Sequence, residues 1–515
     1  MTDIGSEPIK ADAPTSSGQI VPGPGPGPGP GPGPGPGPGP DDRLGVKGNG
    51  GRGMHVAIIG SGAAAFAAAI AAADRGARVT MIEAGTVGGT CVNVGCVPSK
   101  FLVRAGQAAW AQSHPRIAGL ESQAPIIDRP AMLAQQLGLV GQLREEKYQD
   151  ILDSNPAITL VKGRARFKSA NTLLVRDTKG DERKVVADRI LIATGASPSV
   201  PPISGLADTP FWTSETALAS DEIPQHLIVL GGSAIGLELA QAFHRLGAQV
   251  TVIERLGLLP SEDPDVGQAI GEILEDEGIR VMTNSEPSNI AFDDGTFRVE
   301  TPGQTIEGSH LLVATGRNPN TQDLGLEAVG ITTDPNRAIL VDSHLATNVP
   351  GIYAVGDCTA MPALVYVAAA AGTRAATNMT GGDAELDLSV VPRVIFTDPQ
   401  IATVGLSETA ARAAGILIKH RTLSMEHVPR ALASFDTRGF IKLVADRATG
   451  QLLGAQVVAA EGGEIIATAA LAISQGLTID DLADRLFPYL TMAEGLKLCA
   501  QTFTRDVKHL SCCAG

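Results

Sequence analysis

The chain has 515 residues, which is more than one hydrophobic core holds together and predicts about three domains. Its formal net charge of -15 argues against a nucleic-acid partner, because binding to phosphates needs clustered Lys and Arg side chains. Its 6 cysteines are too few and too clustered for the disulfide framework of a secreted protein, so we expect a reducing, cytoplasmic compartment.

Residues 1–53 are expected to form a disordered tail or linker. Between Pro22 and Pro40, proline alternates strictly with glycine, which leaves no side chains to bury in a core. Glycine at every second position, and not at every third, excludes a collagen helix. The opening sequence MTDIGSEPIK lacks the basic and apolar segments of a signal peptide, so no membrane association is expected.

The folded part is expected to begin at Met54, with two copies of one strand, turn, helix and strand pattern. The first copy runs through HVAIIG, an Ala-rich helix and ARVTMIEAG, and the second through HLIVLGG, AIGLELAQAFHRLG and AQVTVIERLG. Runs of Val and Ile with helices between them predict an α/β fold with two Rossmann-like dinucleotide-binding domains. The apolar run VAIIGSGAAAFAAAIAAA is long enough to span a bilayer, but its glycines and strand-like start favour a buried strand, turn and helix.

A repeated sequence closes each of these segments, ILIATGASP at 190–198 and LLVATGRNP at 311–319. After about Leu386 the pattern changes. The segments VPRVIFTDPQIATVG and GFIKLVADRATGQLLGAQVVA are typical of antiparallel strands, so we expect a separate C-terminal α+β domain with flanking helices.

The first glycine-rich turn predicts a dinucleotide site. Gly60 permits a tight turn, Gly62 lets the backbone approach a pyrophosphate at the start of a helix, and Ala65 permits close helix packing. Glu83 ends the following strand, where a carboxylate binds ribose hydroxyls. Because the turn follows a strand, precedes a helix and has its acidic partner at the expected distance, we interpret it as a binding site and not as a mere tight turn.

The second turn contains Gly231 and Gly236, with Ser233 where the second glycine of the pattern would stand. The next strand ends in Glu254 and Arg255, which point to different nucleotides. A carboxylate suits the free 2′-hydroxyl of NADH, whereas an arginine pairs with the 2′-phosphate of NADPH. The residues therefore predict a nicotinamide nucleotide and leave NADPH and NADH both open.

Between the two units lies GGTCVNVGCVPSK, residues 88–100, with Cys91 and Cys96 in a glycine-bounded turn that leads into a helix. Two cysteines at this spacing can close a small disulfide loop, and the helix N-terminus favours a thiolate. Gly, Asn, Pro and Lys surround the pair, which argues against two merely buried cysteines.

With this motif, the chain resembles the flavin-dependent pyridine nucleotide-disulfide oxidoreductases from about Met54 to its C-terminus. The resemblance implies FAD as cofactor, with Cys96 against the flavin and Cys91 in thiol exchange. It places Lys100 near the flavin, paired with Glu238, and assigns Asp357 of YAVGDCT to the ribityl chain, with Cys358 as a small buried residue. Electrons would pass from the nicotinamide to FAD and on to the cysteine pair. The remaining implied cofactor contacts are Gly89, Thr90, Thr194, Gly195 and Gly316.

The same resemblance assigns the domains. Residues 54–206 and 326–386 would form the two parts of the FAD-binding domain, and residues 207–325 the NAD(P)H-binding domain. Residues 387–515 would form a dimerisation domain. The implied assembly is an obligate homodimer with its active site at the subunit interface.

This chain differs from the family's disulfide reductases at the position of the histidine that protonates the leaving thiolate. Those enzymes carry an HPTxxE pattern near the C-terminus, and counting back from Glu494 places Tyr489 at the position of the histidine. A phenol, with a pKa of about 10, is a poor proton shuttle at neutral pH. The change therefore favours a substrate that needs no proton on a leaving sulfur.

Hg(II) is such a substrate, and the branch of the family that reduces it resembles this chain in Tyr489 and in the closing sequence LSCCAG. The ion is soft and prefers two thiolates, so cysteines supply its affinity. The resemblance implies that Cys512 and Cys513 of the partner subunit take Hg(II) from thiol complexes and pass it to Cys91 and Cys96. Tyr148 would flank the ion; without the resemblance it reads as a half-exposed helix residue.

Two alternatives stay open. Some large thioredoxin reductases also end in a vicinal cysteine pair, used as an electron relay, although those enzymes keep the histidine that Tyr489 replaces. A flavoprotein could also scavenge soft metals without turnover, although a complete set of redox residues argues against that. One departure is that no cysteine precedes Cys91, so we expect no N-terminal metal-binding module.

Overall fold

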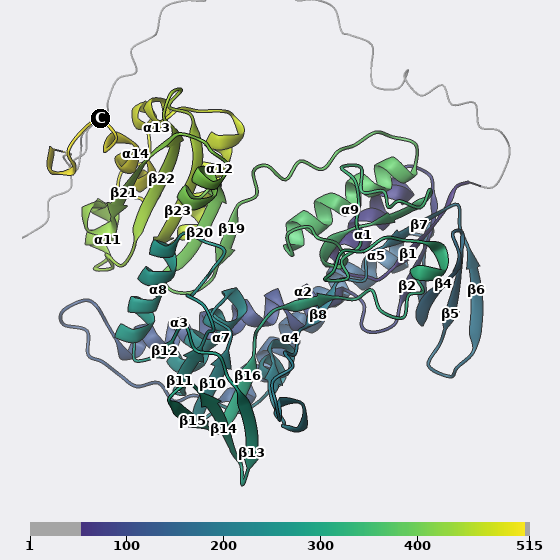
Figure 1. Cartoon of the computed structure of the whole chain (residues 1–515), viewed down its shortest axis with the longest axis horizontal. Coiled ribbons are helices and arrows are strands. Elements are labelled where there is room, and N and C mark those ends of the chain that lie inside the picture. Colours follow the sequence, from purple (N-terminus) through teal and green to yellow (C-terminus); the bar gives the residue numbers. More distant parts are fainter. Residues whose placement is uncertain (1–52, 510–515) are drawn as a thin grey trace, which may run out of the picture. The chain divides into compact units, whose positions relative to one another are not determined.

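The computed structural model describes residues 53–509, whose helices and strands are labelled in Figure 1. The predicted N-terminal tail and the Cys512–Cys513 pair lie outside the described residues, apart from Gly53. Within 53–509, none of the helices combines the length and the apolar character that a membrane crossing requires.

The first sheet is parallel, with strand order β18-β7-β1-β2-β3. The apolar run near the start of the folded part forms β1 (His55–Ile59), a turn and α1 (Ala63–Asp74), as predicted. Helix α9 (Val365–Met379) packs on α1, and a Cβ at Gly372 would lie 2.2 Å from the Ala64 carbonyl oxygen. Small residues therefore allow these two helices to approach closely. The other strands are β2 (Arg78–Glu83), β3 (Ile158–Lys162), β7 (Arg189–Ile192) and β18 (Ile352–Ala354).

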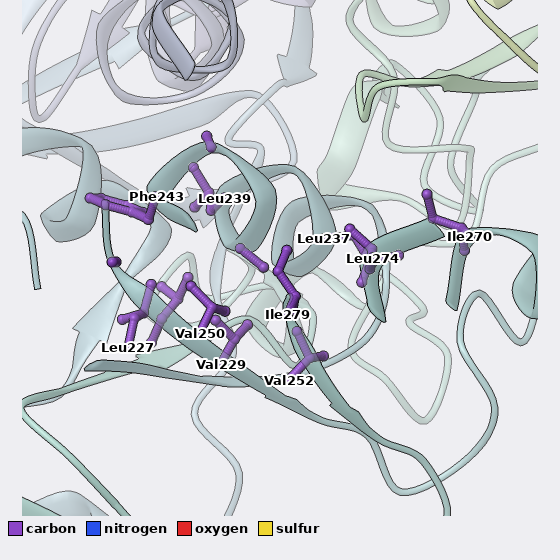
Figure 2. Close-up of a cluster of buried hydrophobic side chains, with 14 of the residues drawn as sticks. Leu227, Val229, Leu237, Leu239, Phe243, Val250, Val252, Ile270, Leu274 and Ile279 are labelled. Carbon is purple, nitrogen blue, oxygen red and sulfur yellow. The ribbon is translucent and has the colours of Figure 1, made fainter. Parts of the chain in front are cut away.

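The second sheet repeats this arrangement with strand order β12-β11-β10-β16-β9. Figure 2 shows its core, where Leu227 and Val229 of β10 and Val252 of β11 lie under Leu237 and Phe243 of α7. The bounds are β9 (Trp212–Thr213), β10 (His226–Leu230), α7 (Ala234–Arg245), β11 (Gln249–Ile253), β12 (Arg280–Met282) and β16 (His310–Val313).

The two repeated sequences noted above pair with each other. Strand β8 (Ala196–Pro198) runs antiparallel to β17 (Arg317–Pro319), so the segments that leave the two parallel sheets are joined side by side. The sequence pattern shows the repeat but not this pairing.

The C-terminal region forms the antiparallel sheet β19-β20-β23-β22-β21, as the sequence predicted. Its strands are β19 (Arg393–Ile395), β20 (Gln400–Gly405), β21 (Ile418–Ser424), β22 (Phe440–Asp446) and β23 (Leu452–Ala459). Its helices are α10 (Glu408–Ala413), α11 (Pro429–Ala433), α12 (Gly462–Ser474), α13 (Ile479–Asp484) and α14 (Glu494–Gln501).

Buried ion pairs tie this C-terminal sheet to the second parallel sheet. Arg245 of α7 lies 2.6 Å from the Glu277 carboxylate and 2.7 Å from that of Asp398, and its side chain is only 2% exposed. Arg438 contacts the same two carboxylates at 2.9 and 3.0 Å. Because buried charges need partners, this network favours one fixed arrangement of the two regions.

Two small antiparallel sheets and several helices complete the described part. The first small sheet contains β4 (Arg164–Ser169), β5 (Thr172–Arg176) and β6 (Glu182–Val186), and the second β13 (Asn289–Asp293), β14 (Thr296–Thr301) and β15 (Gln304–Gly308). The helices are α2 (Gly89–Val94), α3 (Cys96–Ser113), α4 (Arg129–Arg144), α5 (Asp150–Ser154), α6 (Ser214–Ala219) and α8 (Pro264–Asp276), with a π-helical turn at Glu145–Gln149. Short 3₁₀ turns lie at Leu206–Asp208, Glu327–Val329, Gly356–Cys358, Met425–His427 and Val507–His509.

Candidate active site

Three neighbouring cavities form one extended groove at the carboxyl ends of the first parallel sheet. The first, of about 300 Å³, is lined by the redox cysteines and by residues of α1, α3, α6 and α7. It shares Gly62, Thr90 and Gly195 with a second cavity of about 340 Å³. The second shares Glu83 and Thr194 with a third of about 480 Å³. The groove lies at the edge of a parallel sheet and comprises three connected cavities. This position and length suit an extended dinucleotide.

Bare backbone in the middle of the groove fits a pyrophosphate. Gly60 has φ +113°, and a Cβ there would lie 2.2 Å from the Ala193 carbonyl oxygen. A Cβ on Gly89 would lie 2.6 Å from the Cα of Gly62, so Gly89 cannot carry a side chain where the two segments cross. Ala65 is fully buried in the core beneath the turn. The start of α1 is thus open to an anion, which is the chemistry predicted from the sequence.

At the far end of the groove, Glu83 is held by its neighbours. The Ser61 hydroxyl donates a hydrogen bond to the Glu83 carboxylate at 2.6 Å. Thr194 and Asn320 bond reciprocally, from the Thr194 hydroxyl to the Asn320 carbonyl at 2.7 Å and from the Asn320 amide to the Thr194 carbonyl at 3.0 Å. Sequence reasoning missed Asn320; its place directly after the second repeated sequence is the signal that could have drawn attention to it.

Asp357 lies at the other end, among the residues that line the first cavity. Burial raises the pKa of its carboxyl group, and the nearby charge of Arg317 opposes the rise. Arg317, another residue that the sequence analysis did not single out, lines the same cavity. Cys358 is fully buried, as expected.

The redox pair lies at the junction of α2 and α3. Cys91 belongs to α2, and Cys96 is the first residue of α3. Both cysteines line the first cavity. Both are free thiols that share a hydrogen bond. That bond, together with the charge of Lys100, lowers the pKa of Cys96 to about 7 against the opposing effect of burial. The same bond, together with burial, raises the pKa of Cys91 well above its ordinary range. Cys96 is therefore the thiolate of the pair near neutral pH.

Lys100 and Glu238 form the predicted pair, with Nζ 2.7 Å from the carboxylate. The second carboxylate oxygen of Glu238 accepts a hydrogen bond from the Phe396 backbone N–H at 2.9 Å. The Lys100 ammonium also lies 4.4 Å from the centre of the Phe396 ring. Phe396 could not be singled out from the sequence, because its role depends on a backbone group and on chain segments that are distant in sequence.

Tyr148 lies in the π-helical turn and packs against the redox loop, defined here as residues 88–96, which carry both cysteines. Its ring meets that of Phe66 edge-on at 4.8 Å, and one of its ring carbons lies 3.4 Å from the Cβ position of Gly88. Burial raises the pKa of the Tyr148 hydroxyl, and the charges of Cys91 and Cys96 raise it further. The structure therefore brings Tyr148 into the electrostatic neighbourhood of both sulfurs.

The second nucleotide turn has the geometry of the first. A Cβ at Gly231 (φ +115°) would lie 2.4 Å from the Ala314 carbonyl oxygen, and one at Gly236 would lie 2.0 Å from the Gly231 carbonyl oxygen. Glu254 accepts the Gly232 N–H at 2.8 Å. Ser233, the departure from the glycine pattern, is exposed at the start of α7. Arg255 is likewise exposed, and Gly316 (φ +136°) has open space at its Cβ position.

The C-terminal candidates lie elsewhere in the chain. Tyr489, 54% exposed, precedes α14, and Glu494 is the first residue of that helix. Neither belongs to the lining of the first cavity. Cys512 and Cys513 lie beyond the part of the chain that the structure describes.

Comparison with known proteins defines the class. Residues 54–372 match the pyridine nucleotide-disulphide oxidoreductase family, and residues 391–500 match the dimerisation domain of that family. The chain belongs to this family, which confirms the predicted fold class and implies FAD and NADPH as its cofactors. The match to the dimerisation domain supports a homodimer.

The most similar relatives include several proteins described as mercuric reductases. The one from Shewanella putrefaciens is 56% identical over 463 residues, which cover 90% of this chain and 83% of that protein. The one from Acidithiobacillus ferrooxidans is 56% identical over 468 residues, covering 91% and 86%. The one from Streptomyces lividans is 48% identical over 469 residues, covering 90% and 99%.

Solved structures with the same fold include a flavoprotein disulfide reductase. The HOCl-induced flavoprotein disulfide reductase RclA from Escherichia coli, solved as a Cu(II) complex, matches with a TM-score of 0.79 at 30% identity, covering 88% of this chain and 99% of that chain. LpdA from Mycobacterium tuberculosis matches with a TM-score of 0.79 at 29% identity, covering 88% and 100%.

Proposed function

We propose that this chain catalyses the reduction of Hg(II) to Hg(0) by NADPH. With Hg(II) presented as a bis-thiol complex, Hg(SR)₂, NADPH and a proton would give Hg(0), NADP⁺ and two free thiols, RSH. The observation that carries the proposal is the poised Cys91–Cys96 pair beside Lys100 and Glu238, in a chain 56% identical to proteins described as mercuric reductases.

The groove described above would hold FAD, with the pyrophosphate at Gly60, Gly62 and Gly89, the ribose at Glu83 and the ribityl chain at Asp357. When bound, FAD relays the electron pair of the nicotinamide to the neighbouring cysteine pair. The second turn, with Arg255 exposed beside it, would hold NADPH, the nucleotide that the family comparison favours.

Within the first cavity the chain supplies thiol chemistry. Cys96, with its pKa of about 7, is the thiolate of the pair and lines the cavity that would hold the cofactor. Cys91 exchanges with the incoming thiol complex, so that the ion comes to lie between two sulfurs. Lys100, fixed by Glu238 at 2.7 Å, keeps a positive charge near Cys96 and thereby favours its ionised form.

The substrate preference follows from the lack of a good proton donor for a leaving thiolate at the position of Tyr489. Tyr489, in place of a histidine, is a poor proton donor at neutral pH, and a soft ion bound by thiolates needs none. Tyr148 would flank the ion on the side of the redox loop. We further propose that Tyr489 of the partner subunit completes the site, which would then lie at the interface of the homodimer.

Delivery of the ion is assigned to the C-terminal cysteines. We propose that Cys512 and Cys513 of the partner subunit capture Hg(II) and hand it to Cys91 and Cys96 by successive thiol exchange. We also propose a cytoplasmic location, where thiols stay reduced, and the domain boundaries 54–206, 207–325, 326–386 and 387–515.

The two alternatives are less well supported. A thioredoxin reductase-like relay needs a proton donor at the position of Tyr489, and a metal scavenger without turnover does not need the Lys100–Glu238 pair. The curated relatives named above are mercuric reductases, which favours Hg(II) reduction over both.

The decisive experiment measures NADPH oxidation by the purified yellow protein with Hg(II) in excess thiol. NADH, oxidised glutathione and oxidised thioredoxin are tested in parallel, and loss of mercury as vapour is recorded. We expect Hg(II)-dependent turnover that Cys91→Ser abolishes and that Cys499→Ala, a change at a buried cysteine in another region, leaves in place. Rapid turnover of glutathione or thioredoxin without any response to Hg(II) would reject the proposal.

The delivery step has its own test. The double variant Cys512→Ala with Cys513→Ala is expected to lose activity mainly when Hg(II) is bound by a strong dithiol, because monothiol complexes can exchange directly with Cys91. Ser511→Ala is the matched control. Equal activity of the double variant and the wild type with every Hg(II) complex would show that the tail has no role in handover.

A further inference from the structure

Helix α4 has a buried face that is unusually polar. Arg129 and Gln136 are each only 2% exposed, and Val140 is 5% exposed. Arg144, the last residue of the helix, lies on the same face at helical spacing. Long polar side chains on a buried face cost free energy unless they bind something, so the partners of this face indicate its role.

At the N-terminal end of this face, the polar side chains of α4 bind a residue that lines the first cavity. The Arg129 guanidinium and the Gln136 amide donate hydrogen bonds to the Leu218 carbonyl at 3.1 and 2.9 Å. Leu218 belongs to α6 and lines the first cavity. This end of α4 therefore holds the last turn of α6 in place.

At the other end, the partner is the redox loop. Arg144 donates a hydrogen bond to the side-chain carbonyl of Asn93 at 3.1 Å. The Asn93 amide in turn donates to the carbonyls of Val87 and Gly89, both at 2.9 Å. Because its carbonyl accepts and its amide donates, Asn93 fits in one orientation only. Asn93 lies between the two redox cysteines in sequence, so Arg144 restrains the segment that carries both.

Immediately after Arg144, the helix changes to the π-helical turn Glu145–Gln149. Such turns are rare in proteins, but those that occur are often found at functional sites. The wider turn changes the direction in which its side chains point. Here the redirected residue is Tyr148, which meets the Phe66 ring edge-on and lies beside Gly88 of the redox loop. One helix thus carries the arginine that restrains the loop and, four residues later, the tyrosine that packs against it.

We propose that Arg144 and the π-helical turn are positioning elements of the active site, which set the separation between Tyr148 and the sulfurs of Cys91 and Cys96. Arg144 acts through Asn93, and the turn acts by aiming Tyr148. For its effect on Hg(II), the inference rests on the proposed function.

The test compares Arg144→Met with Gln135→Met, a matched control at an exposed position of the same helix. In the holoenzyme, Arg144→Met should speed hydrogen exchange of the α2 amides roughly tenfold, because one hydrogen bond from a charged donor is lost. Hg(II)-dependent kcat should fall about tenfold, whereas NADPH oxidation by ferricyanide, which takes electrons before the cysteine pair, should keep its rate. Arg144→Lys should recover part of both losses.

A double-mutant cycle tests the path through Asn93. If Arg144 acts through Asn93, then adding Arg144→Met to Asn93→Ser should cause no further loss of Hg(II)-dependent turnover. Additive losses would overturn this part of the inference. Unchanged hydrogen exchange and turnover in Arg144→Met, with active wild type, would overturn the rest.

The π-helical turn is tested by deleting Gln149, which allows the α-helix to continue and redirects Tyr148, with Gln149→Ala as control. The deletion should raise the KM for Hg(II) as much as Tyr148→Phe does and should leave ferricyanide reduction intact. A deletion variant with wild-type KM would refute the role of the turn. Failure of the proposed function would look different, because then the wild type itself would show no response to Hg(II).

Discussion

Lys100 of α3 and Glu238 of α7 form an ion pair of 2.7 Å that joins the helix beginning at Cys96 to the helix of the second nucleotide turn. The Glu238 side chain is 7% exposed and that of Lys100 is 36% exposed. The buried carboxylate therefore depends on the ion pair for its stabilisation more than the ammonium group does. Its other oxygen binds the backbone of Phe396, ahead of β20. A single carboxylate thus links three segments that are far apart in sequence.

Lys100→Met should destabilise the protein by about 2 kcal/mol, because it leaves the buried Glu238 carboxylate with one hydrogen bond and no counter-charge. Adding Glu238→Gln should recover part of the loss, since the unpaired charge is then gone. Urea unfolding of the two variants and of Lys100→Arg measures these differences. A double variant less stable than Lys100→Met would contradict the account.

The pKa of about 7 for Cys96 predicts a pH-dependent thiol reactivity. Below pH 7 the thiol is protonated, so its alkylation by iodoacetamide should slow as the pH falls, with the midpoint near 7. Cys91, whose pKa is raised, should react only at much higher pH. Mass spectrometry of the two modified sites in the reduced protein measures both profiles, and Lys100→Met should move the Cys96 midpoint upward. Equal reactivity of the two cysteines across this range would rule out the assignment of the thiolate.

The sequence was sufficient to predict the parts of the site that depend on local patterns. Both glycine turns, the redox cysteines and the Val- and Ile-rich strands are encoded within short segments, and the structure places them as expected. Arg317 and Phe396 could not be predicted, because each meets the groove or the ion pair through contacts between distant segments. The π-helical turn at Tyr148 is a further example, since its sequence EEKYQ is compatible with an ordinary α-helix.

Gly236 should be intolerant of a side chain, because its Cβ would lie 2.0 Å from the Gly231 carbonyl oxygen. Gly236→Ala would push α7 away from the second nucleotide turn, and we expect the KM for NADPH to rise about tenfold or more. Gly271→Ala is the matched control in α8, where the nearest atom to the new Cβ is a flexible Leu258 methyl at 3.5 Å. It should keep the NADPH KM and stabilise the helix by up to about 1 kcal/mol. If the two changes had similar effects on the KM for NADPH, the close approach at Gly236 would not be the cause of the higher KM.

His55 should make the stability of the protein depend on pH below neutrality. Its side chain bonds the Val186 carbonyl at 2.7 Å and the Thr80 hydroxyl at 2.9 Å, and it is only 8% exposed. Burial, followed by the charge of Arg78, lowers the pKa of His55 in the folded protein. The unfolded chain takes up its proton near pH 6.5, before the folded protein does, so the free energy of unfolding should fall as the pH drops from 6.5 towards the lowered pKa. For one proton the loss cannot exceed about 1.4 kcal/mol per pH unit in that window. Denaturant midpoints between pH 5 and 8 should therefore fall less steeply for His55→Gln than for the wild type, and a change at the exposed His427 serves as the control. The same slope in His55→Gln and in the wild type would assign the pH dependence to other groups.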